Sequence, residues 1–339
     1  MQDSATDPRS TALWAAVDRR LERATLEGIL AHKLGPLAAN RLRRLDQPVP
    51  RPLVLEERAA AVSMLTAVPL LERIRELHDG PLLVVKGPDV ARLYPGTARR
   101  FGDLDLLFEE AAEVHATLAA NGFVEVEDPD FEFTPDHHHL QPLRWPALPL
   151  LVEVHKAPNW PASDSRPPSV AELREASVPS ALGLDEVMAL SPLHQTLILA
   201  VHAWSHVPLH TLRDLIDVAA VAAPLDEREL ERTAKRWGIE RIWRTTSDAI
   251  EGVFYGGRET APLRTWARHL EGVRKQSVLE SHVARLLHPY WEAPAHRATL
   301  SLARALGDAV RPLPGETWGE KLRRIGRAVR NPHAPVGRQ

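Results

Sequence analysis

The amino-acid sequence predicts an α+β fold in which a small strand-containing core lies between N-terminal helices and a mostly helical C-terminal region. Apolar residues recur at helical spacing from Thr11 to about Arg44, and a second amphipathic pattern runs from Leu53 to His78. Short runs rich in leucine and valine, which are typical of buried strands, then occur between residues 80 and 157. Beyond this segment strand signals nearly vanish and helical patterns return. The strands are therefore expected to form one small module of α/β or α+β type.

Proline and glycine mark the boundaries between these elements. Gly35-Pro36 interrupts the first helical region, and the proline-rich stretch Gln47–Pro52 connects it to the second. Pro158–Ser169 is a loop by composition. We therefore divide the chain into an N-terminal helical segment (1–79), the core (80–157), a helical domain that would contact a substrate or partner (170–330) and a disordered tail (331–339).

Strands and helices are expected to alternate within the core. The run PLLVVKG indicates a strand that ends in a turn at Lys86-Gly87, and Ala91–Arg100 supplies a short helix and a loop. A second strand is predicted at Leu104–Phe108. The remaining predicted elements are a helix at Glu109–Asn121 with Gly122 as its C-cap, a segment of extended tendency at Phe131–Arg144, and strands at Phe123–Val126 and Leu148–His155.

Composition excludes several classes of protein. The chain has 339 residues, of which 44% are hydrophobic, so it can bury a sizeable core. The formal net charge is only −3, so the protein has no general attraction to long nucleic acid, and we do not expect it to bind one. There is no cysteine, which excludes disulfides, thiolate zinc sites and cysteine nucleophiles.

No feature of the sequence indicates a membrane or secretory protein. The N-terminal MQDSATDPRS lacks the apolar run of a signal peptide. The longest apolar stretches, such as Leu82–Val85 and Leu148–Val152, are far shorter than the roughly 20 residues that span a bilayer. We therefore expect a cytoplasmic protein with no membrane partner.

Two carboxylates interrupt the second predicted strand. Residues i and i+2 of a strand share a face, so Asp103 and Asp105 are expected to point to one side while Leu104 points into the core. The two carboxylates would lie roughly 6 to 7 Å apart along the strand. Glu153, flanked by valines on another predicted strand, supplies a third acid that a buried strand does not need for folding.

Three acids on neighbouring strands suit the hard cations Mg²⁺ or Mn²⁺. Nucleotidyl transfer needs such a site, because one metal lowers the pKa of an attacking hydroxyl and the other holds the triphosphate. The alternative for an isolated Asp-x-Asp motif is a solvated edge strand or turn.

The neighbouring motifs distinguish these interpretations. The stretch VVKGPDVARLYPGTARRFGDLDLLF, followed by LVEVHK, resembles the uncharacterised nucleotidyltransferase family of the DNA polymerase beta superfamily. In that family a strand ends in Lys-Gly, a helix follows, an arginine precedes an Asp-x-Asp strand, and a later strand carries an acid and then a histidine. The similarity spans roughly residues 55 to 255, because HAWSHVPLHTLRDLIDVAAV resembles the family's helical half. The resemblance implies a mixed-sheet nucleotidyltransferase core.

The resemblance also implies roles for individual residues. Asp103 and Asp105 would bind both metals, and Glu153 would bind the metal that activates the acceptor hydroxyl, acting also as the base or its electrostatic substitute. Lys86 and the Gly87 backbone would contact the triphosphate. Arg99 fits the family's arginine, although its neighbour Arg100 stays open. For Lys86 the alternative is a surface lysine at a strand end.

Other polar residues near these motifs have more than one possible role. His155 shares a face with Glu153, so we group it with the nucleotide-binding residues, where it could touch the acceptor or order Glu153; the alternative is a plain hydrogen-bonded histidine. Of His137, His138 and His139, one is expected to face the site and the others solvent. His202 has no assigned role. Arg213 and Asp217 have the i,i+4 spacing of a surface ion pair, which we favour over a cleft role.

These features predict a Mg²⁺- or Mn²⁺-dependent nucleotidyltransferase that moves a nucleotide from a nucleoside triphosphate to a hydroxyl or phosphate of an unknown acceptor. A small molecule or a biosynthetic peptide is favoured as the acceptor. Two alternatives remain: a toxin–antitoxin type enzyme that modifies tRNA or a protein, and a binding protein that has kept the fold without turnover.

Overall fold

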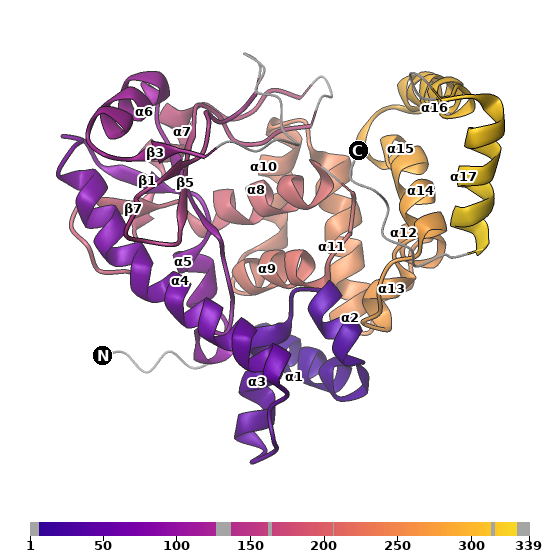
Figure 1. Cartoon of the computed structure of the whole chain (residues 1–339), viewed down its shortest axis with the longest axis horizontal. Coiled ribbons are helices and arrows are strands. Elements are labelled where there is room, and N and C mark those ends of the chain that lie inside the picture. Colours follow the sequence, from indigo (N-terminus) through magenta and orange to yellow (C-terminus); the bar gives the residue numbers. More distant parts are fainter. Residues whose placement is uncertain (1–6, 127–136, 162–164, 206, 313–315, 331–339) are drawn as a thin grey trace.

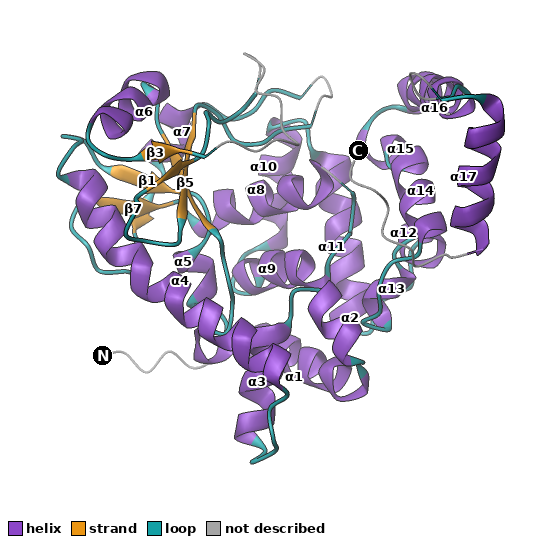
Figure 2. Ribbon diagram, in the orientation of Figure 1, coloured by secondary structure: helices purple, strands orange, loops and turns teal. Residues whose placement is uncertain are grey.

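The computed structural model describes residues 7–126, 137–161, 165–205, 207–312 and 316–330. It confirms the α+β class, because one mixed sheet is surrounded by helices (Figure 1). The sheet lies at one end of the molecule and helices make up the rest (Figure 2). The tail assigned to residues 331–339 lies outside the described residues.

The sheet contains seven strands in the order β3-β4-β5-β2-β1-β7-β6. The central strand, β2, pairs parallel with β5 and antiparallel with β1. The strands are β1 (Leu82–Val84), β2 (Asp103–Leu107), β3 (Val124–Glu125), β4 (Leu143–Arg144), β5 (Leu151–His155), β6 (Val178–Pro179) and β7 (Val187–Ala189).

The sequence did not reveal β6 and β7, which extend the sheet beyond the segment 80–157. β7 pairs parallel with β1, and β6 forms the outer edge. Both are too short to show an alternating pattern, and β6 contains Pro179, which is tolerated at a sheet edge. The core sheet therefore draws strands from two separate parts of the chain.

The first helix begins at Pro8, slightly before the helical pattern that the sequence showed from Thr11, and α4 begins at Arg51 rather than Leu53. Asp7 caps the first helix by accepting a hydrogen bond from the backbone N–H of Ser10, and Thr25 caps the second in the same way through Gly28. The helices before β3 are α1 (Pro8–Arg23), α2 (Leu26–Ala31), α3 (Gly35–Arg44), α4 (Arg51–Arg75), α5 (Pro88–Ala91) and α6 (Ala111–Ala120), with a 3₁₀ turn at Pro95–Thr97.

Helices dominate the chain after β5, as predicted. In Figure 1, α8 and α9 lie between the sheet and α11, while α14 to α17 lie on the side away from the sheet. These helices are α7 (Val170–Glu175), α8 (Pro192–Ser205), α9 (Leu212–Ala222), α10 (Glu227–Arg236), α11 (Glu240–Phe254), α12 (Ala261–Thr265), α13 (Arg268–Glu271), α14 (Val278–Leu287), α15 (Pro289–Glu292), α16 (Ala295–Val310) and α17 (Trp318–Arg330).

The pleat of the sheet divides the buried apolar residues into two clusters. Leu104 and Leu106 of β2 pack with Val152 of β5 and with buried residues of α4 and α6. Leu107 of β2 and Leu83 of β1 instead join the cluster formed by the helical half. Side chains alternate along a strand, so Asp103 and Asp105 share the face of β2 that carries Leu107. This face is directed at the C-terminal helical half and not at α4 and α6.

Two buried histidines connect the N-terminal helices to the C-terminal half. His32, after α2, accepts a hydrogen bond at Nδ1 from the Leu212 backbone N–H (3.0 Å) and donates one from Nε2 to the Arg274 carbonyl (2.8 Å). His269 stacks on the His32 ring and donates from Nε2 to the His210 carbonyl. Burial lowers the pKa of both rings, that of His269 to about 4, so both are neutral near pH 7.

We predict that the free energy of unfolding decreases as the pH falls from about 6.5 towards 4. The unfolded chain takes up a proton on His269 in this range, whereas the folded protein excludes it, so the stabilisation is present above the unfolded-state pKa and is lost below it. The shift corresponds to about 3 kcal/mol at the acid end. His269→Gln keeps a donor towards the His210 carbonyl and removes the titration. Urea unfolding across this range should give a shallower pH dependence for the variant; equal slopes would contradict the role of His269.

Candidate active site

Three carboxylates come together on the face of the sheet that is directed at the helical half. β2 carries Asp103 and Asp105, and the parallel register places Asp105 beside Glu153 of β5. Asp105 is only 2% exposed, whereas Glu153 is partly open to solvent. The acids that the strand pattern indicated therefore lie close together, and Asp105 is more deeply buried than Glu153.

Two cations compensate the buried charge of Asp105. Lys86, two residues after the end of β1, places Nζ 3.3 Å from Asp105 Oδ1. His155, at the end of β5, places Nε2 3.0 Å from the same oxygen and 3.3 Å from Glu153 Oε2. One carboxylate oxygen thus lies between a lysine and a histidine, while Asp105 Oδ2 is buried without a hydrogen-bond partner among the described residues.

These contacts shift the pKa values of the acids in opposite directions. Burial opposes ionisation of Asp105, but Lys86 and His155 hold its pKa well below the usual range. Burial and the neighbouring Asp105 carboxylate raise the pKa of Asp103 to about 6. Burial disfavours the charged form of His155, yet its contacts with Asp105 and Glu153 raise its pKa to about 9. Asp103 is therefore the acid with the weakest compensation.

The turn after β1 depends on a glycine. Gly87 has φ of +76°, a left-handed conformation that glycine adopts without steric cost, and it precedes α5. The acid two residues later has a structural role: Asp89 accepts hydrogen bonds from the Ser180 hydroxyl (3.0 Å) and the Ala181 backbone N–H (2.7 Å). Asp89 therefore ties this turn to the strand β6.

Arg99 joins the core to the helical half. Its Nε and Nη2 each donate a hydrogen bond of 2.7 Å to Asp217 of α9, and the Tyr94 hydroxyl donates to the same carboxylate. Both members of the pair are at most 5% exposed. Nη1 of Arg99 is buried without a hydrogen-bond partner within the described residues. Most of the guanidinium predicted to contact nucleotide is therefore engaged by the protein.

The predicted surface ion pair between Arg213 and Asp217 is wrong. Asp217 is buried against Arg99, and Arg213 instead lies 3.3 Å from Asp214, its neighbour in sequence. The i,i+4 spacing cannot show that α9 turns Asp217 towards the core. Both Arg213 and Asp217 line the cavity above the carboxylates.

The histidine run also differs from expectation. His137, His138 and His139 all line the cavity, with ring nitrogens within 4.8 Å of one another, so the prediction that only one would face the site is wrong. The segment is not a regular strand, because its one ladder contact is an isolated bridge between His139 and His155. Burial lowers the pKa of all three, that of His138 to about 3.

Two groups of side chains in this region have the composition of a metal site. Asp105, Glu153 and His155 offer mainly oxygen donors, which suit Mg²⁺ or Mn²⁺. The three consecutive histidines offer neutral nitrogen donors, which suit a borderline ion such as Zn²⁺.

All these residues border one cavity of about 430 Å³ between the sheet and the helical half. Sequence reasoning did not connect Lys33, Asn159 or Asp214 with it, and gave His202 no role. No local pattern marks these positions, because they reach the cavity only through packing of distant segments. The cavity is lined by Lys33 of the N-terminal region and by residues of α8 and α9.

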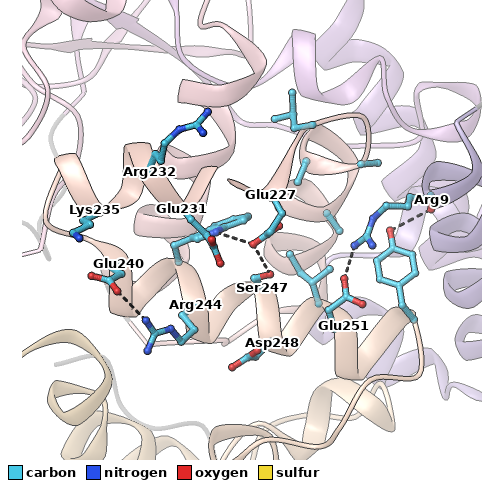
Figure 3. Close-up of a pocket in the computed structure, with 17 residues that line it drawn as sticks. Arg9, Glu227, Glu231, Arg232, Lys235, Glu240, Arg244, Ser247, Asp248 and Glu251 are labelled. Atoms are coloured by element: carbon cyan, nitrogen blue, oxygen red, sulfur yellow. Dashed lines mark hydrogen bonds and ion pairs between the residues drawn. The ribbon is translucent and has the colours of Figure 1, made fainter. Parts of the chain in front are cut away.

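A second cavity, of about 650 Å³, lies between α10 and α11 (Figure 3). Several of its charged side chains have partners within the protein: Arg244 bonds Glu240, Arg9 bonds Glu251, and Glu227 accepts hydrogen bonds from Trp243 and Ser247. No group of three potential metal ligands was found there among the described residues. Although this cavity is larger, it holds no such group of ligands, so the first cavity is the candidate active site.

Comparison with known families agrees with this choice. A family model described as "Uncharacterised nucleotidyltransferase" matches residues 14–248, more than half of the chain. The chain belongs to this family. Its members are nucleotidyltransferases, so the protein is an enzyme of that general class, which uses nucleoside triphosphates and divalent metals. A search of curated proteins and a search of solved structures each found no significant match.

The match covers α2 to α10 completely and includes all the residues of the carboxylate group. It ends within α11, so α12 to α17 lie outside it. Within the described part of the chain, no helix has the length and apolar character needed to cross a bilayer.

We predict that Asp217→Asn lowers the free energy of unfolding by about 3 to 5 kcal/mol, because it leaves the Arg99 charge buried without its counter-ion. Glu240→Gln, which breaks an exposed pair with Arg244, should cost less than about 0.5 kcal/mol. Urea unfolding of both variants measures the contrast. Similar losses in the two variants would show that the buried pair does not stabilise the junction.

Proposed function

We propose that this family member is a Mg²⁺- or Mn²⁺-dependent enzyme that transfers a nucleotide from a nucleoside triphosphate to a hydroxyl or phosphate of a small molecule or a biosynthetic peptide. The observation that carries the proposal is the group of Asp103, Asp105 and Glu153 on adjacent parallel strands, facing one cavity. Such a group is expensive to bury and has no role in packing, so a cationic ligand accounts for it best.

The side chains fit a divalent cation. Asp105 Oδ2 is buried and lacks a partner among the described residues, and Asp103 is poorly compensated by the protein. When bound, the metal supplies positive charge to the phosphates and lowers the pKa of the acceptor hydroxyl. Asp103, Asp105 and Glu153 would hold it.

The chain's own residues would then orient the reactants. Glu153 is more exposed than Asp105, so it is placed to receive the acceptor proton. His155 holds both Glu153 and Asp105 and so orients the pair. In the reaction the acceptor oxygen forms a bond to the α-phosphorus. The bond between the α-phosphorus and the oxygen that bridges it to the β-phosphorus breaks, and pyrophosphate leaves.

The cavity favours a small acceptor over tRNA. It encloses about 430 Å³, and two of its cations, Lys86 and Arg99, face inward on carboxylates of the protein. An RNA-binding surface would need exposed basic residues around the opening, and the net charge of −3 offers no general attraction to a polyanion. A small molecule or a peptide side chain is therefore the better match.

Retention of turnover is favoured over a binding-only role. A protein that only bound nucleotide would have no use for three clustered acids, which repel the triphosphate in the absence of metal. The compensation of Asp105 by both Lys86 and His155 keeps this acid of the cluster in its ionised form.

Calorimetry with Mg²⁺ and each nucleoside triphosphate tests the proposal. The wild type should bind nucleotide only when metal is present. Replacing Asp103 and Asp105 together by Asn should weaken metal-dependent binding about 100-fold or more, since even partners of metal ligands contribute up to this much. Glu153→Gln, at a more exposed acid, provides a second variant for which folding is less at risk.

Asp248→Asn is the matched control, because Asp248 is an exposed acid in the second cavity. It should bind nucleotide as the wild type does. Metal-independent binding, or equal affinity in the Asp103 and Asp105 double variant, would contradict the assignment of the metal site.

A further inference from the structure

The cations that line the candidate active site are mostly engaged by the protein's own acids. Lys86 pairs with Asp105, and Arg99 forms two hydrogen bonds with Asp217. Arg100 lies 3.0 Å from Glu56. A nucleoside triphosphate carries about four negative charges, so its terminal phosphates need cations that are not already paired in this way.

Lys33 meets this requirement. It lines the cavity from the turn between α2 and α3, and its side chain forms no hydrogen bond or ion pair with any other described residue. Lys33 is exposed as a residue, although part of its side chain is buried. This partial burial and the nearby Arg213 lower the pKa of the ammonium group, whereas Asp214 and Asp103 raise it. The ammonium group therefore lies in the field of both the helical half and the carboxylates.

The backbone of Lys33 is in a conformation that favours glycine. Its φ is +57°, and the turn is closed by hydrogen bonds from the Lys33 N–H to the Leu30 carbonyl and from the Leu34 N–H to the Ile29 carbonyl. This is the usual ending of a helix by a left-handed residue, where glycine is preferred. A lysine here costs stability, and strain of this kind concentrates at functional positions.

Arg213 provides a second cation, close enough to Lys33 to lower its pKa. It is in the first turn of α9 and lines the cavity. Its Nη2 lies 3.3 Å from Asp214 Oδ1, a single contact, and its Nε is buried without a hydrogen-bond partner in the described part of the chain. Its side chain is 20% exposed, so it can contact a ligand without a large rearrangement.

We propose that Lys33 and Arg213 together bind the terminal phosphates of the nucleoside triphosphate. The inference rests on the proposed function and names the phosphate-binding residues of that site. Lys33 lies between α2 and α3 and Arg213 lies in α9, so the polyphosphate would contact both the N-terminal region and the helical half. Two neighbouring cations repel each other, and an anion between them removes that cost.

The test compares Lys33→Gly and Arg213→Gln with the wild type by calorimetry in the presence of Mg²⁺. The probes are ATP, AMP and inorganic tripolyphosphate. Each substitution should weaken binding of ATP and of tripolyphosphate about tenfold or more, since each removes charge-assisted hydrogen bonds, and should leave AMP binding within about twofold. Arg244→Gln is the matched control, because Arg244 is an arginine of the second cavity, where it pairs with Glu240.

Thermal unfolding separates this role from a structural one. Lys33→Gly relieves the left-handed strain, so its melting temperature should equal or exceed that of the wild type while its affinity for ATP falls. A variant with higher stability and weaker polyphosphate binding is not explained by damage to the fold.

The outcomes distinguish this inference from the proposed function. If the wild type binds ATP with metal and the Lys33→Gly and Arg213→Gln variants bind it equally well, the inference is overturned and the proposed function stands. An equal loss for AMP and ATP would also overturn it, because the residues would then contact another part of the nucleotide or the acceptor. Wild type that binds tripolyphosphate through Lys33 but not ATP would support the phosphate site and count against nucleotidyl transfer. Binding of neither would contradict both.

Discussion

The arrangement of the candidate site depends on the compensation of one buried charge. Asp105 is almost inaccessible to solvent, and a carboxylate there is stable only because Lys86 and His155 both approach it. These two residues lie at or just after the ends of the strands on either side of β2, so the pairing of β1, β2 and β5 is what brings them to the acid. The same pairing places Glu153 beside Asp105. Sheet register and electrostatics therefore specify the site together.

A second buried pair sets the position of the helical half relative to the sheet. Arg99 precedes β2 and forms two hydrogen bonds with Asp217 of α9. If either side chain moved away, the charge of the other would stay buried without a counter-ion. His32 adds a hydrogen bond to the backbone at the start of the same helix. As a result α9 presents Arg213 to the cavity, and the N-terminal segment presents Lys33 close to it.

Local patterns in the sequence predicted the parts of the structure that local physics determines. Helical periodicity placed the N-terminal and C-terminal helices, and the alternation of Leu104 with its neighbouring acids placed Asp103 and Asp105 on one face. The sequence could not show which acid each cation meets. Asp217 had a nearby arginine in its own helix but pairs with one 118 residues away. The strands β6 and β7 were missed for a related reason, because their pairing with β1 is long-range and each is only two or three residues long.

The central claim is that Asp103, Asp105 and Glu153 hold the catalytic cations. The most direct measurement is anomalous X-ray scattering from crystals of the full chain grown with Mn²⁺ and a non-hydrolysable nucleoside triphosphate. The account predicts manganese bound to carboxylate oxygens of β2 and β5, with a phosphate oxygen of the nucleotide as a further ligand. Manganese bound only by His137, His138 and His139, or no manganese at the carboxylates of these strands, would contradict it.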